Sequence, residues 1–169
     1  MTTAQLYLFS VLALIFTTVV AVISRATPRR IAGAIIGATA AGLVGLGIIV
    51  FCESKGWWRF VMKWEPYDLT LLWISVALCA YVFLITWRIA RRFGGRGLAV
   101  AALVAAVIGP FRDSAYMAMF PEWGSYAPGP APMLAISVAY VLMGIAGHGV
   151  MRLVAGPAEA DRLARRPWE

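Results

Sequence analysis

The chain has 169 residues, of which 62% are hydrophobic, with a mean hydropathy of +0.79 and a formal net charge of +7. This composition excludes a water-soluble domain of such a size and predicts an integral membrane protein. The charge does not indicate nucleic-acid binding, because the arginines gather at the ends of apolar segments, where they set membrane topology.

Five apolar segments predict an all-α bundle of five transmembrane helices. Each segment has about the 20 residues that a helix needs to cross the hydrocarbon core. The expected spans are residues 4–24, 31–52, 69–87, 98–120 and 133–153. They form one transmembrane domain, residues 1–157, and the basic residues 158–169 are expected to form an interfacial C-terminal tail that meets anionic headgroups.

Charge predicts the orientation of the bundle. Arginine-rich segments follow the first, third and fifth spans, and acid-containing segments follow the second and fourth. Since positively charged connections stay in the cytoplasm, we expect the N-terminus outside and the C-terminus in the cytoplasm. The first span is not a cleaved signal, because Arg25 follows it and no cation precedes it. The expected location is the inner (plasma) membrane of a prokaryote, as a multi-pass protein.

Small residues recur at every fourth position of the second span, at Gly33, Gly37, Ala41 and Gly45. In a membrane, small residues at this spacing allow a neighbouring helix to approach closely. The stripe therefore predicts helix packing. It is not a phosphate-binding loop, because the Lys-Ser/Thr of such a loop is missing.

Cofactor-binding residues are scarce. The chain has a single histidine, His148, and two cysteines, Cys52 and Cys79, which lie in different apolar segments. This excludes a haem held by two histidines of this chain and disfavours a zinc site. We expect neither a metal nor a cofactor, and we expect His148 to have a packing role.

The connection from residue 53 to residue 68 is rich in aromatic side chains, including Trp57 and Trp58. Tryptophan prefers the headgroup layer, so this segment is expected to lie on the outer membrane surface. Two interpretations stay open. The segment is either an aromatic belt or a lid over a site that opens toward that surface.

The most polar part of any predicted span is the turn that carries Arg112 and Asp113 in the fourth span. Ionised side chains at membrane depth are costly, so they indicate a functional site. Adjacent helical positions point about 100° apart, so the two side chains need not pair, whereas Tyr116 is within reach of either. Pro110 predicts a kink there and leaves the carbonyl of Ala106 without its helical partner.

Glu53 and Asp113 are both expected near the outer surface. Two carboxyl groups beside an apolar cavity suit acid catalysis, in which one protonates an alkene and the other stabilises the resulting carbocation. Aromatic faces also stabilise cations. The candidate catalytic residues are therefore Glu53, Asp113, Arg112 and Tyr116, and the candidate substrate-binding residues are Trp57, Trp58, Trp73 and Trp123.

The order of several residues resembles the integral-membrane carotenoid hydratases, over roughly residues 45–150. The elements are Glu53-Ser-Lys-Gly56, Pro66, Trp73, Asp113 and Trp123. Where that family has a second aspartate followed by proline, this chain has Met117 and Ala118. More loosely, the chain is similar to small membrane-bound terpene cyclases. The resemblance implies acid chemistry on an isoprenoid.

Two functional hypotheses follow. The first is a membrane enzyme, a cyclase, hydratase or isomerase, that protonates an isoprenoid or other terpenoid lipid. The second is a non-catalytic membrane subunit or small carrier in which Arg112 and Asp113 make contacts between helices or with a partner. A homo-oligomer or a partner subunit is compatible with either hypothesis, whereas a nucleic-acid partner is not expected.

Overall fold

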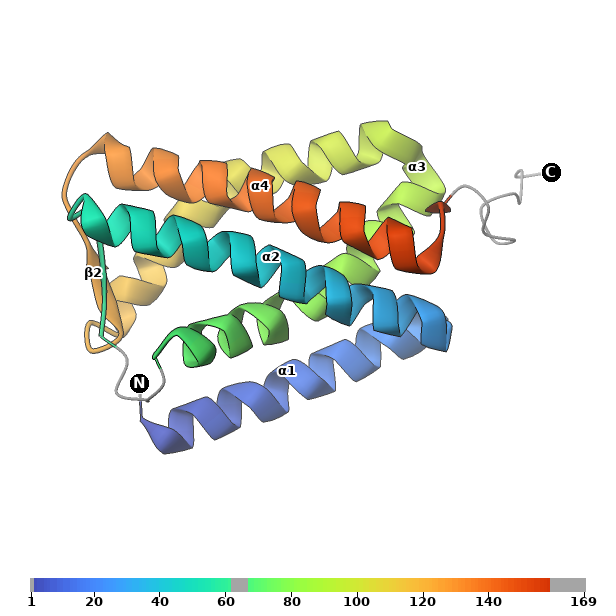
Figure 1. Cartoon of the computed structure of the whole chain (residues 1–169), viewed down its shortest axis with the longest axis horizontal. Helices are drawn as coiled ribbons and strands as arrows, with labels where there is room; N and C mark the ends of the chain where they lie inside the picture. The colour runs from blue at the N-terminus through green and yellow to red at the C-terminus, as the bar shows by residue number, and fades with distance from the viewer. Residues whose placement is uncertain (1, 62–66, 159–169) are drawn as a thin grey trace.

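A computed structural model describes residues 2–61 and 67–158 of the chain. Within these residues the elements follow the order α1 (Thr3–Ile23), α2 (Pro28–Ser54), β1 (Trp58–Phe60), α3 (Tyr67–Met119), β2 (Gly124–Tyr126) and α4 (Pro130–Ala155) (Figure 1). Residues 62–66 of the predicted interfacial segment, including Pro66, and residues 159–169 of the predicted tail lie outside the described residues.

The all-α prediction is confirmed. The described residues contain four helices that are long and apolar enough to cross a membrane. Helices α1, α2 and α4 contain the predicted first, second and fifth spans to within a few residues. Local sequence fixes two of the helix starts, because Thr2 and Gln5 form a capping box at α1 and Thr27 caps α2 ahead of Pro28.

The predicted third and fourth spans belong to one 53-residue element, α3, which is interrupted at Gly94. Gly94 has φ 62° and ψ −155°, a conformation that glycine adopts without steric cost. Figure 1 shows that the chain turns back at this point, so that both arms of α3 run to the same end of the bundle. The connection between the expected third and fourth spans, residues 88–97, is therefore confined to a bend at Gly94. The arginines there continue the two helical arms, because arginine is a good helix former.

The small-residue stripe of α2 packs closely, as predicted. Gly33, Gly37, Ala41 and Gly45 are all buried. A Cβ added to Gly37 would lie 2.5 Å from the carbonyl oxygen of Gly147 in α4. The two backbones thus touch at a place where any side chain would push them apart. The α2–α4 pair is completed by the first arm of α3, which contributes Phe83 and Leu84 to the core.

A two-stranded antiparallel sheet, which was not predicted from the sequence, lies at one end of the bundle. It pairs Trp58 with Tyr126 and Phe60 with Gly124, and so joins the predicted aromatic segment to the connection before α4. A Cβ on Gly124 would lie 2.4 Å from the carbonyl oxygen of Arg59. The aromatic segment is therefore anchored in part by backbone pairing, and Trp58 is buried against α2 and α4.

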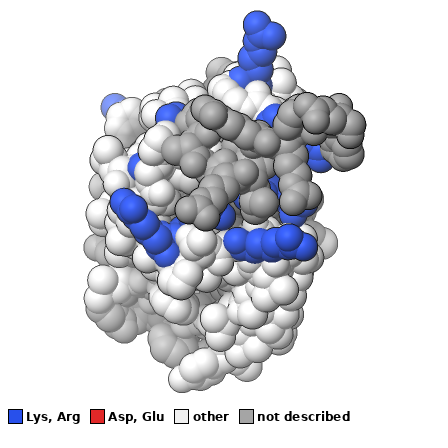
Figure 2. Space-filling model, turned by 90° about the vertical axis from the view of Figure 1, so that its right-hand side faces the viewer, with Lys and Arg blue, Asp and Glu red and all other residues white. Residues whose placement is uncertain are grey.

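Charge is distributed unequally between the two ends. Figure 1 places the N-terminus and the β-sheet at one end and the bend of α3 at the other. The bend end carries Arg25, Arg29, Arg30, Arg88, Arg91, Arg92, Arg96 and Arg152. Figure 2 shows basic side chains on this face and no acidic ones among the described residues. As expected, Glu53, Asp113 and Glu122 lie toward the opposite end.

The α2–α4 contact predicts that a larger side chain at Gly37 destabilises the protein. Gly37→Ala is expected to lower the free energy of unfolding by about 1–3 kcal/mol, because the new methyl group meets the Gly147 backbone. Gly47→Ala is the matched control, since a Cβ at Gly47 meets nothing within 4 Å. Thermal or denaturant unfolding in mild detergent measures both. Equal stability of the two variants would contradict the packing argument.

Candidate functional site

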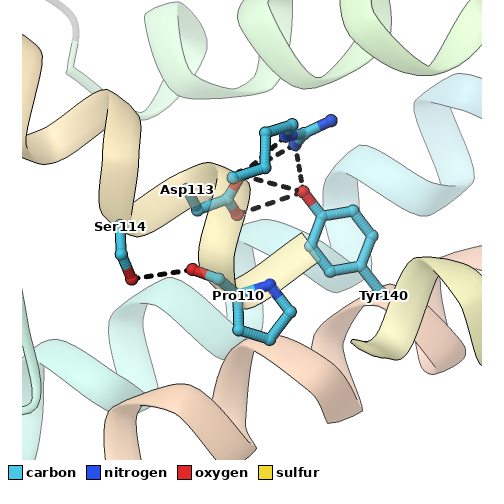
Figure 3. Close-up of polar contacts among 5 residues, drawn as sticks. Pro110, Asp113, Ser114 and Tyr140 are labelled. Carbon is cyan, nitrogen blue, oxygen red and sulfur yellow. Dashed lines mark hydrogen bonds and ion pairs between the residues drawn. The ribbon is translucent and has the colours of Figure 1, made fainter. Parts of the chain in front are cut away.

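The charged turn of α3 forms a compact polar cluster with α4. Arg112 donates to Oδ1 of Asp113 from Nε at 3.0 Å and from a terminal nitrogen at 2.8 Å. The hydroxyl of Tyr140 lies 3.0 Å from each carboxylate oxygen of Asp113 (Figure 3). Arg112 also donates to the Tyr140 hydroxyl. We call Arg112, Asp113 and Tyr140 the RDY cluster. It connects the second arm of α3 to α4.

Arg112 and Asp113 form an ion pair, although adjacent positions on a helix point in different directions. A flexible arginine side chain can wrap around the helix to reach its neighbour. In apolar surroundings the attraction between opposite charges is stronger than in water. The ion pair is only partly buried, because the Arg112 side chain is 48% exposed and that of Asp113 is 21% exposed. Asp113 is thus held on the inner side of the cluster, and Arg112 faces outward.

Tyr140 takes the place that the sequence assigned to Tyr116. Tyr116 does lie near the charges, but it presents its ring, 5.9 Å from the Arg112 guanidinium. Tyr140 can reach Asp113 because α3 has no side chain at Gly109. A Cβ there would lie 2.3 Å from the Tyr140 ring. Sequence reasoning missed Tyr140. A tyrosine within an apolar span, whose hydroxyl needs a partner, was the available signal.

Pro110 lies within the second arm of α3, where the chain stays helical. Among the described residues of α3, non-helical backbone angles occur at Gly94 and not at Pro110. The carbonyl of Ala106, which Pro110 cannot satisfy, accepts instead a 2.7 Å hydrogen bond from the hydroxyl of Ser137 in α4. A second helix therefore supplies the missing donor, and the helix continues through the proline. This contact also joins α3 to α4.

Glu53 makes a contact with the β-sheet. Its Oε1 accepts a 3.1 Å hydrogen bond from the backbone N–H of Phe60, which joins the last residue of β1 to the end of α2. No hydrogen bond or ion pair described in the structure joins Glu53 to Asp113. The sequence placed both carboxylates correctly at one end of the bundle, but it did not foresee that each binds its own partners.

The four candidate substrate-binding tryptophans make contacts within the protein. Trp58 is buried, and its indole N–H donates to the carbonyl of Pro132 at 3.4 Å. Trp73 donates to the hydroxyl of Ser10 in α1 at 2.9 Å. Trp123 stacks on Phe120, and the ring of Trp57 meets Phe51 edge-on. These side chains pack at the end of the bundle that carries the β-sheet, and none of them lines the cavity described next.

A cavity of about 390 Å³ lies between the end of α3, β2 and the start of α4. Its lining includes Ser114, Met117, Tyr126 and Met133, and neither Glu53 nor Asp113 belongs to it. Ser114 follows Asp113 directly, but its hydroxyl donates to the carbonyl of Pro110 at 2.7 Å (Figure 3). Burial, and then the charge of Asp113, raise the pKa of the Tyr126 phenol, while Arg112 lowers it. Tyr126 thus lines the cavity and is close enough to the RDY cluster for the charges of that cluster to affect its pKa.

The remaining residues considered for metal or cofactor binding are the histidine and the two cysteines. His148 is buried, with Nδ1 3.2 Å from the Thr86 hydroxyl and its ring near Trp87, as expected for a packing residue. Cys52 and Cys79 are free thiols. Among residues 2–61 and 67–158, no three His, Cys, Asp or Glu side chains are grouped so that they could hold a metal ion.

Comparison of the chain with protein-family models, with curated proteins and with solved structures finds no match. The resemblance to carotenoid hydratases and terpene cyclases therefore stays a prediction from the sequence. Functional argument rests on the geometry of the RDY cluster and its surroundings.

The Ser137–Ala106 contact predicts a coupling between two positions in different helices. Ser137→Ala is expected to lower the free energy of unfolding by about 1–3 kcal/mol, because it leaves a partly buried carbonyl without its donor. Pro110→Ala returns an N–H to that carbonyl, so the serine substitution should cost less in its background. A double-mutant cycle from unfolding in detergent measures the coupling. Additive effects would show that the Ser137 hydroxyl does not replace the missing donor.

Proposed function

We propose that this chain is a non-catalytic membrane protein, a subunit or small carrier, in which the RDY cluster fastens α3 to α4. The observation that carries the proposal is the Tyr140 hydroxyl, which comes from α4 and lies within hydrogen-bond distance of both oxygens of Asp113. A general acid must present its proton to a substrate atom within hydrogen-bond reach. The oxygens of Asp113 instead meet Arg112 and Tyr140, which favours a contact between helices over proton transfer to a lipid.

The proposal includes a topology of five spans with the N-terminus outside and the C-terminus in the cytoplasm. A straight helix of 53 residues would be about 80 Å long, far more than the roughly 30 Å of hydrocarbon that a span must cross. Each arm of α3 is long enough to cross by itself. The arginines at the bend end favour the cytoplasmic side for Gly94 under the positive-inside rule.

This topology can be tested by cysteine labelling in a variant without Cys52 and Cys79. Ser125→Cys lies in the connection before α4, and Gly95→Cys lies at the bend of α3, where a Cβ meets nothing within 4 Å. Both sites are exposed. In intact cells a membrane-impermeant maleimide is expected to label residue 125 and to label residue 95 only after lysis. Labelling of both from the same side would rule out two crossings by α3.

The helix-fastening role of the RDY cluster predicts linked losses of stability. Asp113→Asn and Tyr140→Phe are each expected to lower the free energy of unfolding in detergent by about 1–3 kcal/mol, because asparagine lacks the carboxylate charge and one acceptor oxygen, and phenylalanine lacks the hydroxyl. The double variant should lose less than the sum, since the two residues share one contact. An enzyme acid would behave differently, because Asp113→Asn would abolish turnover and leave stability unchanged.

Tyr81→Phe is the matched control for Tyr140→Phe. Tyr81 also lies in the bundle, where its ring packs near Phe16, and no hydrogen bond of its hydroxyl is described. Its loss of stability is expected to be small. If Tyr140→Phe and Asp113→Asn were as stable as this control, the RDY cluster would not fasten the helices, and the proposal would fail.

The second candidate is a membrane enzyme that protonates an isoprenoid lipid, as a cyclase, hydratase or isomerase. The observation that favours it is the cavity lined by Ser114, Tyr126 and Met133, one residue along α3 from Asp113. Mass spectrometry of lipids that co-purify in mild detergent tests this candidate. A bound prenyl lipid that is lost on Met133→Trp would support the enzyme.

A further inference from the structure

A narrow crevice lies between α1 and the first arm of α3, at the arginine-rich end of the bundle. Its volume is about 120 Å³, and it is lined by Val20, Ile23, Ser24, Ile85 and Arg88. Except for the serine hydroxyl and the guanidinium, its walls are apolar. The crevice is thus shaped and lined for part of a hydrocarbon chain, and it has a cation at its border.

Arg88 is held at this border by a contact with α1. One of its terminal nitrogens donates to the carbonyl of Ile23 at 3.1 Å, and the residue is exposed. A guanidinium has five N–H donors in a planar fork that matches the oxygens of a phosphate. The Ile23 contact fixes the side chain beside the crevice and uses one donor.

The surroundings of the crevice favour an anion. Arg25 follows Ser24 directly and is exposed, and Arg92 lies one helical turn beyond Arg88. Figure 2 shows no Asp or Glu side chain among the described residues on this face. A negative group here meets Arg88, on a face that carries further arginines and no described acid. Basic pockets between membrane helices are known to hold anionic lipid headgroups.

We propose that this crevice binds an anionic phospholipid, with one acyl chain against Val20, Ile23 and Ile85 and the phosphate on Arg88. The crevice offers an apolar wall and a fixed guanidinium at its border. An inorganic anion would bind only the guanidinium, and a neutral lipid would contact only the apolar wall. The crevice is separate from the RDY cluster at the other end of the bundle. The assignment therefore goes beyond the proposed function and does not depend on it.

Native mass spectrometry of the full chain in detergent tests the headgroup. Phosphatidylglycerol and phosphatidylcholine with identical acyl chains are added in turn, and the first lipid adduct is compared. We expect the wild-type protein to favour phosphatidylglycerol about five-fold, as one arginine near the lipid surface would give. Arg88→Gln should abolish this preference. Arg96→Gln, which removes an equal charge from the same end but not from the crevice, should keep it.

The acyl chain and the source of the phosphate are tested separately. Ile85→Trp fills the crevice and is expected to reduce the phosphatidylglycerol adduct several-fold. Val82→Trp is its control, because Val82 is equally exposed on the same helix (40% against 41%) and does not line the crevice. Glycerol phosphate, which has no acyl chain, should not displace the lipid.

Three results would overturn this assignment. Equal losses in the Arg88 and Arg96 variants would indicate unspecific attraction to a basic surface. An unchanged adduct in Ile85→Trp would show that the crevice holds no acyl chain. Displacement by glycerol phosphate would identify a site for free phosphate esters. Thermal unfolding confirms that each variant is folded before its adducts are compared.

Discussion

The close approach of α2 to α4 sets the spacing on which the other contacts of the bundle depend. At Gly37 and Gly147 the two backbones touch, and a Cβ at Gly147 would lie 1.9 Å from the ring of Phe83 in the first arm of α3. Three helical segments therefore converge where two residues have no side chain. In a membrane, where lipid gives helices no hydrophobic reason to associate, this close van der Waals contact is a main source of attraction.

The second arm of α3 joins this core by two polar contacts with α4. One is the RDY cluster, and the other is the hydrogen bond from Ser137 to the carbonyl that Pro110 leaves free. Both need close approach at Gly109 and Tyr140. Polar groups in an apolar medium must find partners within the protein. The charges at Arg112 and Asp113 can thus be explained by the joining of helices, without a reaction.

The two ends of the bundle differ in chemistry as well as in charge. One end has a small β-sheet, tryptophans that connect elements, and a cavity near Tyr126. The other end has arginines, a bend at Gly94 and the crevice between α1 and α3. Helix α1 contacts the bundle mainly through α3, so the groove beside it is open to lipid along part of its length. A lipid bound there would add packing surface to the least buried helix.

The sequence by itself determined the helical class, the extent of most helices, the packing stripe of α2, and the separation of arginines from acids. These features follow from local pattern: the length of an apolar segment, the spacing of small residues, and the position of charges relative to both. The tertiary structure decided the rest. The sequence could not show that Tyr140 would reach Asp113, or that Ser137 would replace a donor lost at residue 110, because each partner lies about 30 residues away. Nor could it show that Glu53 would bind the backbone of Phe60, since that contact requires a sheet formed by two distant segments. Pairings of this kind depend on which helix faces meet, and a single sequence specifies those faces only through the packing of the whole bundle.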